Sequence, residues 1–161
     1  MRKNKGFSLV ELIIVIAIMA ILVGIMVPVM MHFIEKSNVS SDYQLADTVR
    51  SAVAYSIVDA RVRDDLASQD DLELLENPTD TFSGVVGVDI STLDSGTVLL
   101  ESLTEYIGMD PSLVVGQIKS EHGADCKCVI STTNGVVKVT FTETDSTGKK
   151  KPNANPDIVV Q

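Results

Sequence analysis

A single carboxylate near the N-terminus, Glu11, stands at the start of an uncharged run from Leu12 to Met31. A charge inside a membrane helix costs on the order of 2.5–3.5 kcal/mol on insertion scales, so such a residue is by default a functional one. The chemistry open to it is charge pairing with an amine. The alternative is a charge tolerated at the membrane edge, where a side chain reaches polar groups.

Two cysteines and a histidine form the other group of reactive side chains: His122, Cys126 and Cys128. A disulfide across the one residue between the cysteines would be strained. One histidine beside two thiols is too few ligands for an ordinary zinc site, so we expect no bound metal. The plainer interpretation is two thiols on one face of a strand, because side chains alternate along a strand.

The sequence indicates no catalytic group elsewhere. Neither His32 nor His122 has a nucleophile motif near it, and the sequence holds no phosphate-binding glycine loop. We therefore expect a protein that is not an enzyme and that needs no cofactor.

The charges divide the chain into an apolar head and an acidic body. Arg2, Lys3 and Lys5 precede the apolar run, whereas acidic residues dominate from Asp42 onward. Basic residues before a membrane span hold the N-terminus in the cytoplasm, so the body is expected outside. The net charge of −9 argues against nucleic acid as a partner of the body.

The apolar run is long enough to cross a bilayer, because at 1.5 Å per residue it would span roughly 30 Å as a helix. Gly24 and Pro28 predict a kink or loosened turn, since proline removes a backbone donor and clashes one turn back. A secretory signal peptide would have a shorter core and a small-residue cleavage site. A plain membrane anchor fits the length but leaves Glu11 unexplained. Processing between Gly6 and Phe7 is the third possibility.

The stretch KGFSLVELIIVIAIMAILVGIMVP, residues 5–28, resembles the N-terminal signature of type IV pilins and the related pseudopilins. The shared features are a short basic leader ending in glycine, a phenylalanine, and a glutamate four residues later inside an apolar helix that reaches a proline. Here these residues are Gly6, Phe7, Glu11 and Pro28. The resemblance covers the N-terminal segment and does not extend into the body.

The resemblance implies cleavage after Gly6 by a prepilin peptidase that is also the N-methyltransferase acting on Phe7. It also implies an assembly ATPase, a membrane platform protein, and other pilins, minor pilins included, as partners. Glu11 would neutralise the Phe7 ammonium of a neighbouring subunit in a homo-oligomeric helical filament, or that of its own chain on the same helix face. A subunit in the wrong axial register would leave both charges unpaired, so Glu11 would set the assembly register.

The leading expectation is therefore a structural subunit of a type IV pilus-like filament, or fimbrium. Before assembly it would be a single-pass protein of the inner or cytoplasmic membrane, with its C-terminal body outside, and after assembly part of a cell-surface pilus. One alternative is a pseudopilin of a type II secretion or DNA-uptake (competence) system. An alternative of another class is a membrane-anchored extracellular binding domain. Cell adhesion, twitching and DNA capture all stay open as uses of the filament.

We expect three segments: a leader at 1–6, a transmembrane and filament-core helix at 7–33, and an extracytoplasmic globular domain at 34–161. Apolar residues at helical spacing continue beyond the membrane span and predict one long helix from about Phe7 to about Leu66. Its second half is amphipathic and should pack on a small antiparallel sheet. The predicted fold class is therefore α+β.

Shorter elements of the body follow from local signals. Two further helices are predicted, at 68–75 with a capping Ser68 and at 97–107 with a stop at Gly108, and a loop is predicted over 79–96. Strands are predicted at 113–119, 127–132, 136–142 and 157–160. Asn134-Gly135, between the middle two strands, is a strong hairpin signal.

Family members often hold the C-terminal region with a disulfide or, in some pseudopilins, with a calcium ion. Cys126 and Cys128 are too close for the first, and Asp145 and Asp157 lack EF-hand-like spacing for the second, so we interpret these aspartates as turn residues. We interpret the basic run 149–151 as a solvated loop. If the filament binds DNA or another anionic surface, this run is where we expect the contact.

Overall fold

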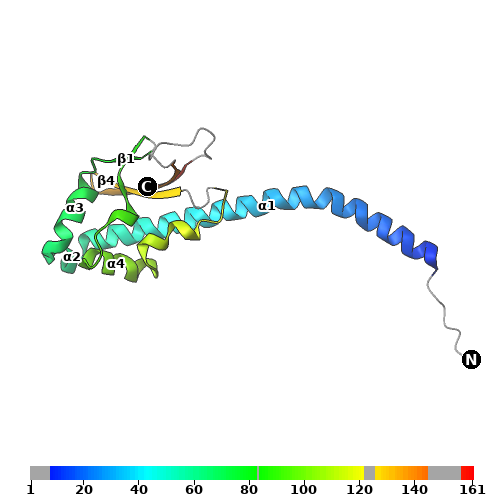
Figure 1. The fold of residues 1–161 in the computed structure, drawn as a ribbon, viewed down its shortest axis with the longest axis horizontal. Helices are drawn as coiled ribbons and strands as arrows, with labels where there is room; N and C mark the ends of the chain where they lie inside the picture. Colours follow the sequence, from blue (N-terminus) through cyan, green and yellow to red (C-terminus); the bar gives the residue numbers. More distant parts are fainter. Residues whose placement is uncertain (1–7, 83, 122–125, 145–156) are drawn as a thin grey trace, which may run out of the picture. The chain divides into compact units, whose positions relative to one another are not determined.

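The computed structural model describes residues 8–82, 84–121, 126–144 and 157–161. The chain divides into two compact units, Met1–Ser37 and Asn38–Gln161. The described part of the first unit is helical, and its helix continues into the second unit. The second unit holds the other described helices and strands (Figure 1).

Helix α1, Leu9–Val58, is by length and composition able to cross a membrane in its apolar part. Its N-terminal half is apolar apart from Glu11 and His32, whereas its C-terminal half buries one face, which is mostly apolar, and carries polar residues on the other. Gly24 and Pro28 lie inside the helix, and the helical assignment continues through both of them. The kink at these two residues stays a prediction.

Helix α1 ends earlier than predicted. Asp59 has an extended backbone (φ −66°, ψ 124°), and its side chain accepts a hydrogen bond from the backbone N–H of Arg61. A separate short helix, α2, Ala60–Asp64, begins there, so the prediction of one helix to Leu66 was wrong. Aspartate caps a new helix readily, and the apolar spacing used for the prediction does not register such a cap.

A 3-10 turn and a helix follow α2: η1, Leu66–Ser68, and α3, Gln69–Glu76. Ser68 makes no capping hydrogen bond to α3, so its predicted capping role was wrong. Its hydroxyl instead donates to Asp65 Oδ2 at 2.6 Å and accepts the backbone N–H of Leu99 at 3.0 Å. The helix ends just before Asn77-Pro78, as predicted.

The segment 79–96, predicted as a loop, contains short elements: β1, Thr81–Phe82; β2, Val85–Val86; β3, Val88–Asp89; and the 3-10 turn η2, Ile90–Thr92. Strands β1 and β2 pair with each other, and β3 joins the main sheet. The prediction was wrong because strands of two residues are too short to show alternation.

Helix α4, Val98–Ile107, confirms the helix predicted over 97–107. The Thr97 side chain accepts the backbone N–H of Leu100 and caps the start of the helix. Gly108 ends it with a φ of 81°, a left-handed conformation that glycine adopts without a steric penalty.

The prediction of a strand at 113–119 was wrong. Two 3-10 turns occupy this region: η3, Pro111–Leu113, and η4, Val115–Gln117. The Asp110 side chain accepts the backbone N–H of Ser112 at 2.8 Å, and Pro111 favours the start of a helical turn. Val114 is buried while its neighbour Leu113 is exposed, so the apolar run places one side chain in the core rather than forming a strand face.

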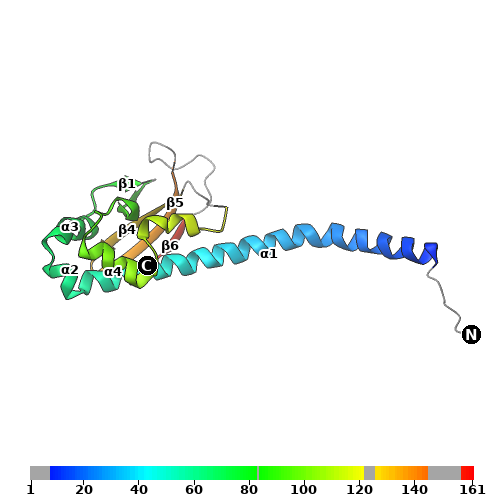
Figure 2. The ribbon, with the colours of Figure 1, turned by 60° about the horizontal axis from the view of Figure 1, so that its bottom comes forward.

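The main sheet is antiparallel, with the order β3-β4-β5-β6. Figure 2 labels three of its strands, β4, β5 and β6. Its longer strands are β4, Cys126–Thr133, and β5, Val136–Glu143, and its last is β6, Ile158–Val160. Asn134 and Gly135 form the turn between β4 and β5 with φ values of 53° and 78°, which confirms the predicted hairpin. The predicted strand at 157–160 is also confirmed.

One core holds the second unit together. Side chains of α1, α4 and one face of the sheet meet in it and are fully buried, among them Val49, Val53, Leu99, Leu103, Ile130 and Phe141. The fold is therefore α+β, with a long N-terminal helix packed through its C-terminal half on a small antiparallel sheet, as predicted.

Candidate functional site at the start of the apolar helix

Glu11 lies in the first turn of α1, and Ser8 stands just before the helix. The backbone N–H of Ser8 donates a hydrogen bond of 2.9 Å to Glu11 Oε2. A glutamate at the third helical position that accepts this N–H makes one half of a capping box. Its negative charge also faces the positive end of the helix dipole, so the start of the helix stabilises the carboxylate.

None of the described residues covers the apolar half of α1. Every described residue from Ser8 to Ile34 is exposed, and none of the most apolar 18-residue window is buried. Removing one Leu, Ile or Val side chain from water contributes about 1.5–3 kcal/mol. An apolar surface of this extent is therefore stable only in lipid or against other chains.

Glu11 keeps capacity for a second partner. A carboxylate has two oxygens with about four lone-pair sites, and the bond from Ser8 occupies one of them. The hydrogen bond holds the carboxylate at the start of the helix, and Glu11 is exposed there, so its other lone pairs are open to a partner. The arrangement is thus suited to binding a cation rather than to catalysis.

Two of the residues predicted to take part in processing, Gly6 and Phe7, lie outside the described residues. Cleavage after Gly6, methylation of Phe7 and the assembly role of Glu11 therefore stay predictions. Gly24, the other small residue singled out, has no described atom near the position of a Cβ. This part of the helix surface is open to a partner.

Sequence reasoning missed Ser8. The signal was present, because Ser8 and Glu11 have the Ser-x-x-Glu spacing of a capping box that precedes an apolar run. The contact matters for the site because it gives Glu11 a partner within its own chain before any other chain arrives.

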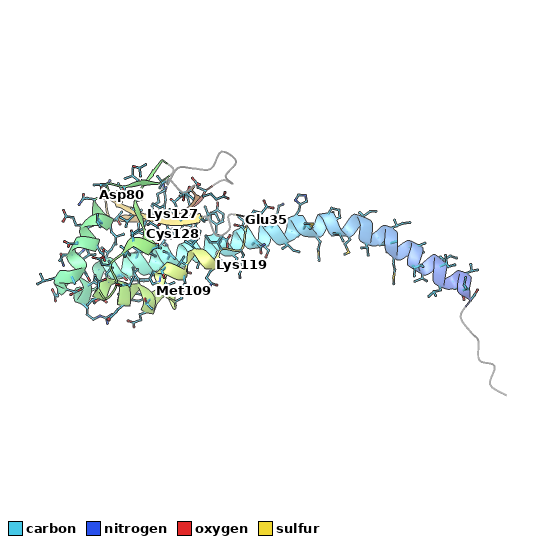
Figure 3. All side chains as sticks on the ribbon, in the orientation of Figure 1. Glu35, Asp80, Met109, Lys119, Lys127 and Cys128 are labelled. Atoms are coloured by element: carbon cyan, nitrogen blue, oxygen red, sulfur yellow. The ribbon has the colours of Figure 1, made fainter. Side chains whose placement is uncertain are left out.

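Cys126 and Cys128 are both buried on β4, which confirms two thiols on one face of a strand (Figure 3 labels Cys128). Both are free thiols. Burial raises the pKa of Cys126 to about 12 and raises the pKa of Cys128 well above its usual value. Both therefore stay protonated at neutral pH and do not react as thiolates there. Among the described residues, no group of His, Cys, Asp and Glu side chains is arranged to hold a metal ion.

Several other residues that the sequence singled out lie outside the described residues: His122, Asp145 and the basic run 149–151. His32 is exposed on α1, and Asp157 is half-buried just before β6. The interpretation of Asp145 as a turn residue and of the basic run as a solvated loop stays a prediction.

Comparison with known proteins bears on the N-terminal segment. A family model described as the prokaryotic N-terminal methylation motif matches residues 1–27. A fimbrial protein of Moraxella nonliquefaciens is 41% identical over 54 residues, which cover 34% of this chain and 35% of that protein. The chain thus spans about a third of the length of this curated relative. No solved structure matches the chain.

Proposed function

We propose that this chain, whose N-terminus is that of the type IV pilin family, is a structural subunit of a type IV pilus-like filament. The observation that carries the proposal is the uncovered apolar half of α1 with a single carboxylate at its start. A helix that only anchors a domain in lipid gains nothing from this carboxylate. In a helix that moves from lipid into a bundle of identical helices, the carboxylate can select the axial register of the subunit.

The proposed sequence of events begins in the membrane. Segment 7–33 spans the inner or cytoplasmic membrane, with the basic leader 1–6 inside and the body, 34–161, outside. A prepilin peptidase then cuts after Gly6, and Phe7 becomes the methylated N-terminal residue. The cut creates an ammonium group on Phe7, near the start of the helix where the Glu11 carboxylate lies.

Charge pairing then distinguishes the filament from the lipid. Lipid tails and a bundle of apolar helices are about equally apolar, so hydrophobic burial barely favours one over the other. A buried charge left without its partner costs about 3–5 kcal/mol. A subunit whose Glu11 meets the Phe7 ammonium of a neighbour avoids that cost, whereas a subunit in the wrong register does not.

The contact with Ser8 is compatible with this role. While the subunit is alone in the membrane, the Ser8 N–H and the helix dipole lower the cost of the Glu11 charge. In the filament the remaining lone pairs of the same carboxylate accept the neighbour's ammonium. The cap orients the carboxylate, and the charge pair selects the register.

The proposal implies definite partners. They are a prepilin peptidase that is also an N-methyltransferase, an assembly ATPase with its platform protein, other copies of this chain, and minor pilins. The assembled protein would lie on the cell surface as a pilus. A pseudopilin would use the same N-terminal steps in a shorter filament, so filament length separates the two.

The test separates capping from charge pairing. Glu11→Gln keeps an oxygen for the Ser8 N–H but has no charge, whereas Glu11→Ala loses both. We expect both variants to insert in the membrane and to be cleaved after Gly6, and neither to enter filaments. The measurement is the amount of each variant in filaments sheared from cells, relative to the amount in the membrane fraction.

Ser8→Ala is the matched control, because it keeps the backbone N–H that Glu11 accepts, and it should assemble normally. Mass spectrometry of the wild-type N-terminus should show methylated Phe7. Normal filament content for Glu11→Gln would overturn the charge-pairing role. Filaments whose subunits retain the leader would overturn the proposed processing. Long surface fibres in electron micrographs support a pilus, and short stubs support the pseudopilin alternative.

A further inference from the structure

A cavity of about 390 Å³ opens in the second unit, where the C-terminal end of α1 meets α2, the end of α3 and the turn between β4 and β5. Its volume lies within the range of small-ligand sites. The cavity lies at the C-terminal end of α1, whereas Glu11 lies in the first turn of that helix.

The lining of the cavity has an apolar part, here called the floor, and a charged part, here called the wall, whose two charges are opposite. Ile57 and Val137 are buried and contribute the floor together with Ala54. Arg63 Nε donates a hydrogen bond of 2.7 Å to the carbonyl oxygen of Ile57, so the guanidinium is held in place. Its Nη2 lies 4.0 Å from Glu76 Oε1, which leaves one positive and one negative group at the wall.

Two side-chain amides also line the cavity. The side chains of Asn77 and Asn134 line the cavity and make no hydrogen bond to a described residue. Each amide offers two donor hydrogens and an acceptor oxygen. Beside them Arg63 is a donor held in place and Glu76 is an acceptor, so the cavity lining offers both donors and acceptors next to apolar side chains.

These features select the charge of the ligand. Because Glu76 compensates Arg63, the cavity has no excess charge to attract an ion. The chain as a whole has a net charge of −9, which repels anions. A neutral ligand with both hydroxyl donors and acceptors on its edge and C–H groups on its face fits the site. We propose that this cavity, defined by Ala54, Arg63, Glu76, Asn77 and Asn134, binds a neutral saccharide.

The proposal is tested on the full-length chain, independently of filament assembly. The protein is held in a zwitterionic detergent, because maltoside and glucoside detergents carry sugar head groups. Saturation-transfer NMR is recorded with glucose, galactose, N-acetylglucosamine, lactose and maltose as neutral probes, and with glucuronate as the anionic probe. We expect transfer to at least one neutral sugar and much weaker transfer to glucuronate.

Three variants locate the binding. Glu76→Gln removes the charged acceptor, Asn134→Gly removes an amide while keeping the left-handed turn, and Ala54→Leu fills the floor. We expect Glu76→Gln to weaken binding about tenfold and Ala54→Leu to abolish it. Glu101→Gln, an exposed carboxylate on α4 outside the cavity, is the matched control and should bind as the wild type does.

Several results would overturn the saccharide site. They are no transfer to any of the neutral sugars, equal transfer to glucuronate, or unchanged binding in both Glu76→Gln and Ala54→Leu. Because none of these readouts needs a filament, failure of the saccharide site leaves the proposed subunit function standing. The reverse holds as well, since the filament tests involve no sugar.

Discussion

The side chain of Asp42 accepts a hydrogen bond of 2.9 Å from the backbone N–H of Ser120, 78 positions further along the chain. Its other oxygen accepts the backbone N–H of Lys119, also at 2.9 Å (Figure 3 labels Lys119). Asp42 lies on α1 and is only 1% exposed, so water cannot replace it as the partner of these amides. The contact fastens the segment that follows η4 to the long helix.

Replacing this carboxylate should destabilise the second unit strongly. In Asp42→Asn, one oxygen becomes an NH2 group that faces a backbone N–H, so a donor meets a donor in a buried place. Hydrogen bonds to charged groups contribute about 1.5–3 kcal/mol each, and an orphaned buried donor adds a desolvation cost. We expect a loss of about 3 kcal/mol in the free energy of unfolding, measured by chemical denaturation of the full chain in micelles.

The matched control for Asp42 is Asp47→Asn. Asp47 is exposed on the same helix and pairs with Arg50 in a surface salt bridge, which contributes only about 0.2–1 kcal/mol. A similar loss in the free energy of unfolding for the two variants would show that the buried contact of Asp42 contributes no more to stability than the surface salt bridge.

Because of Asp71, the stability of the second unit should fall as the pH rises. Burial raises the pKa of this carboxyl above its usual value, although the backbone N–H of Asp94 acts in the opposite sense. The folded state thus holds a proton at a pH where the unfolded chain has released it. The protonated Asp71 carboxyl therefore contributes its full stabilisation below the pKa that it has in the unfolded chain. This stabilisation is lost as the pH rises through the pKa that it has in the folded state.

Asp71→Asn removes this titration. We expect the variant to have a higher melting temperature than the wild type at pH 7, with a difference that shrinks as the pH falls through the pKa of the folded state. The measurement is the melting temperature of the variant and of the wild type at a series of pH values from acid to neutral. Asp70→Asn, an exposed neighbour in the same turn, should alter the melting temperatures much less, because the charge of Asp70 is the smallest of the causes that raise the pKa of Asp71. A constant difference across the range would contradict the role assigned to Asp71.

The two buried thiols should resist alkylation until the protein unfolds. Thiol reagents attack the thiolate, and burial raises the pKa of Cys126 to about 12 and that of Cys128 well above its usual value. With iodoacetamide at pH 8, mass spectrometry should show no label on either cysteine in the folded chain and a label on both in denaturant. Rapid labelling of Cys126 in the folded chain would show that this thiol is accessible and ionised.

Local signals in the sequence were enough for several elements of the body. Asn134-Gly135 has the residue types that a two-residue hairpin turn requires, and Gly108 has the conformation that ends a helix. These residues act through their own backbone angles, so no knowledge of distant partners is needed. The apolar run and Glu11 were equally visible, because membrane length and an isolated charge are properties of one segment.

Elements set by distant partners could not be predicted in the same way. Strand β3, Val88–Asp89, exists because β4 lies beside it, about 40 positions later in the chain. The apolar stretch 113–119 has the composition of a strand, but none of the described strands pairs with it and a turn that starts at Pro111 leads into it. Asp42 likewise gives no local sign of its role, since both of its partners lie beyond η4.

Gly87 shows how strand β3 constrains the sequence next to it. A Cβ at this position would lie 2.5 Å from Val129 Cγ1 and 2.6 Å from the carbonyl oxygen of Ile130, and the backbone oxygen cannot move aside alone. We expect Gly87→Ala to cost about 1–3 kcal/mol in the free energy of unfolding, as overpacking does. Gly116→Ala, where no described atom lies within 4 Å, should change it by less than about 0.5 kcal/mol. Equal stabilities of the two variants in denaturant titrations would mean that β3 does not pair with β4 this closely.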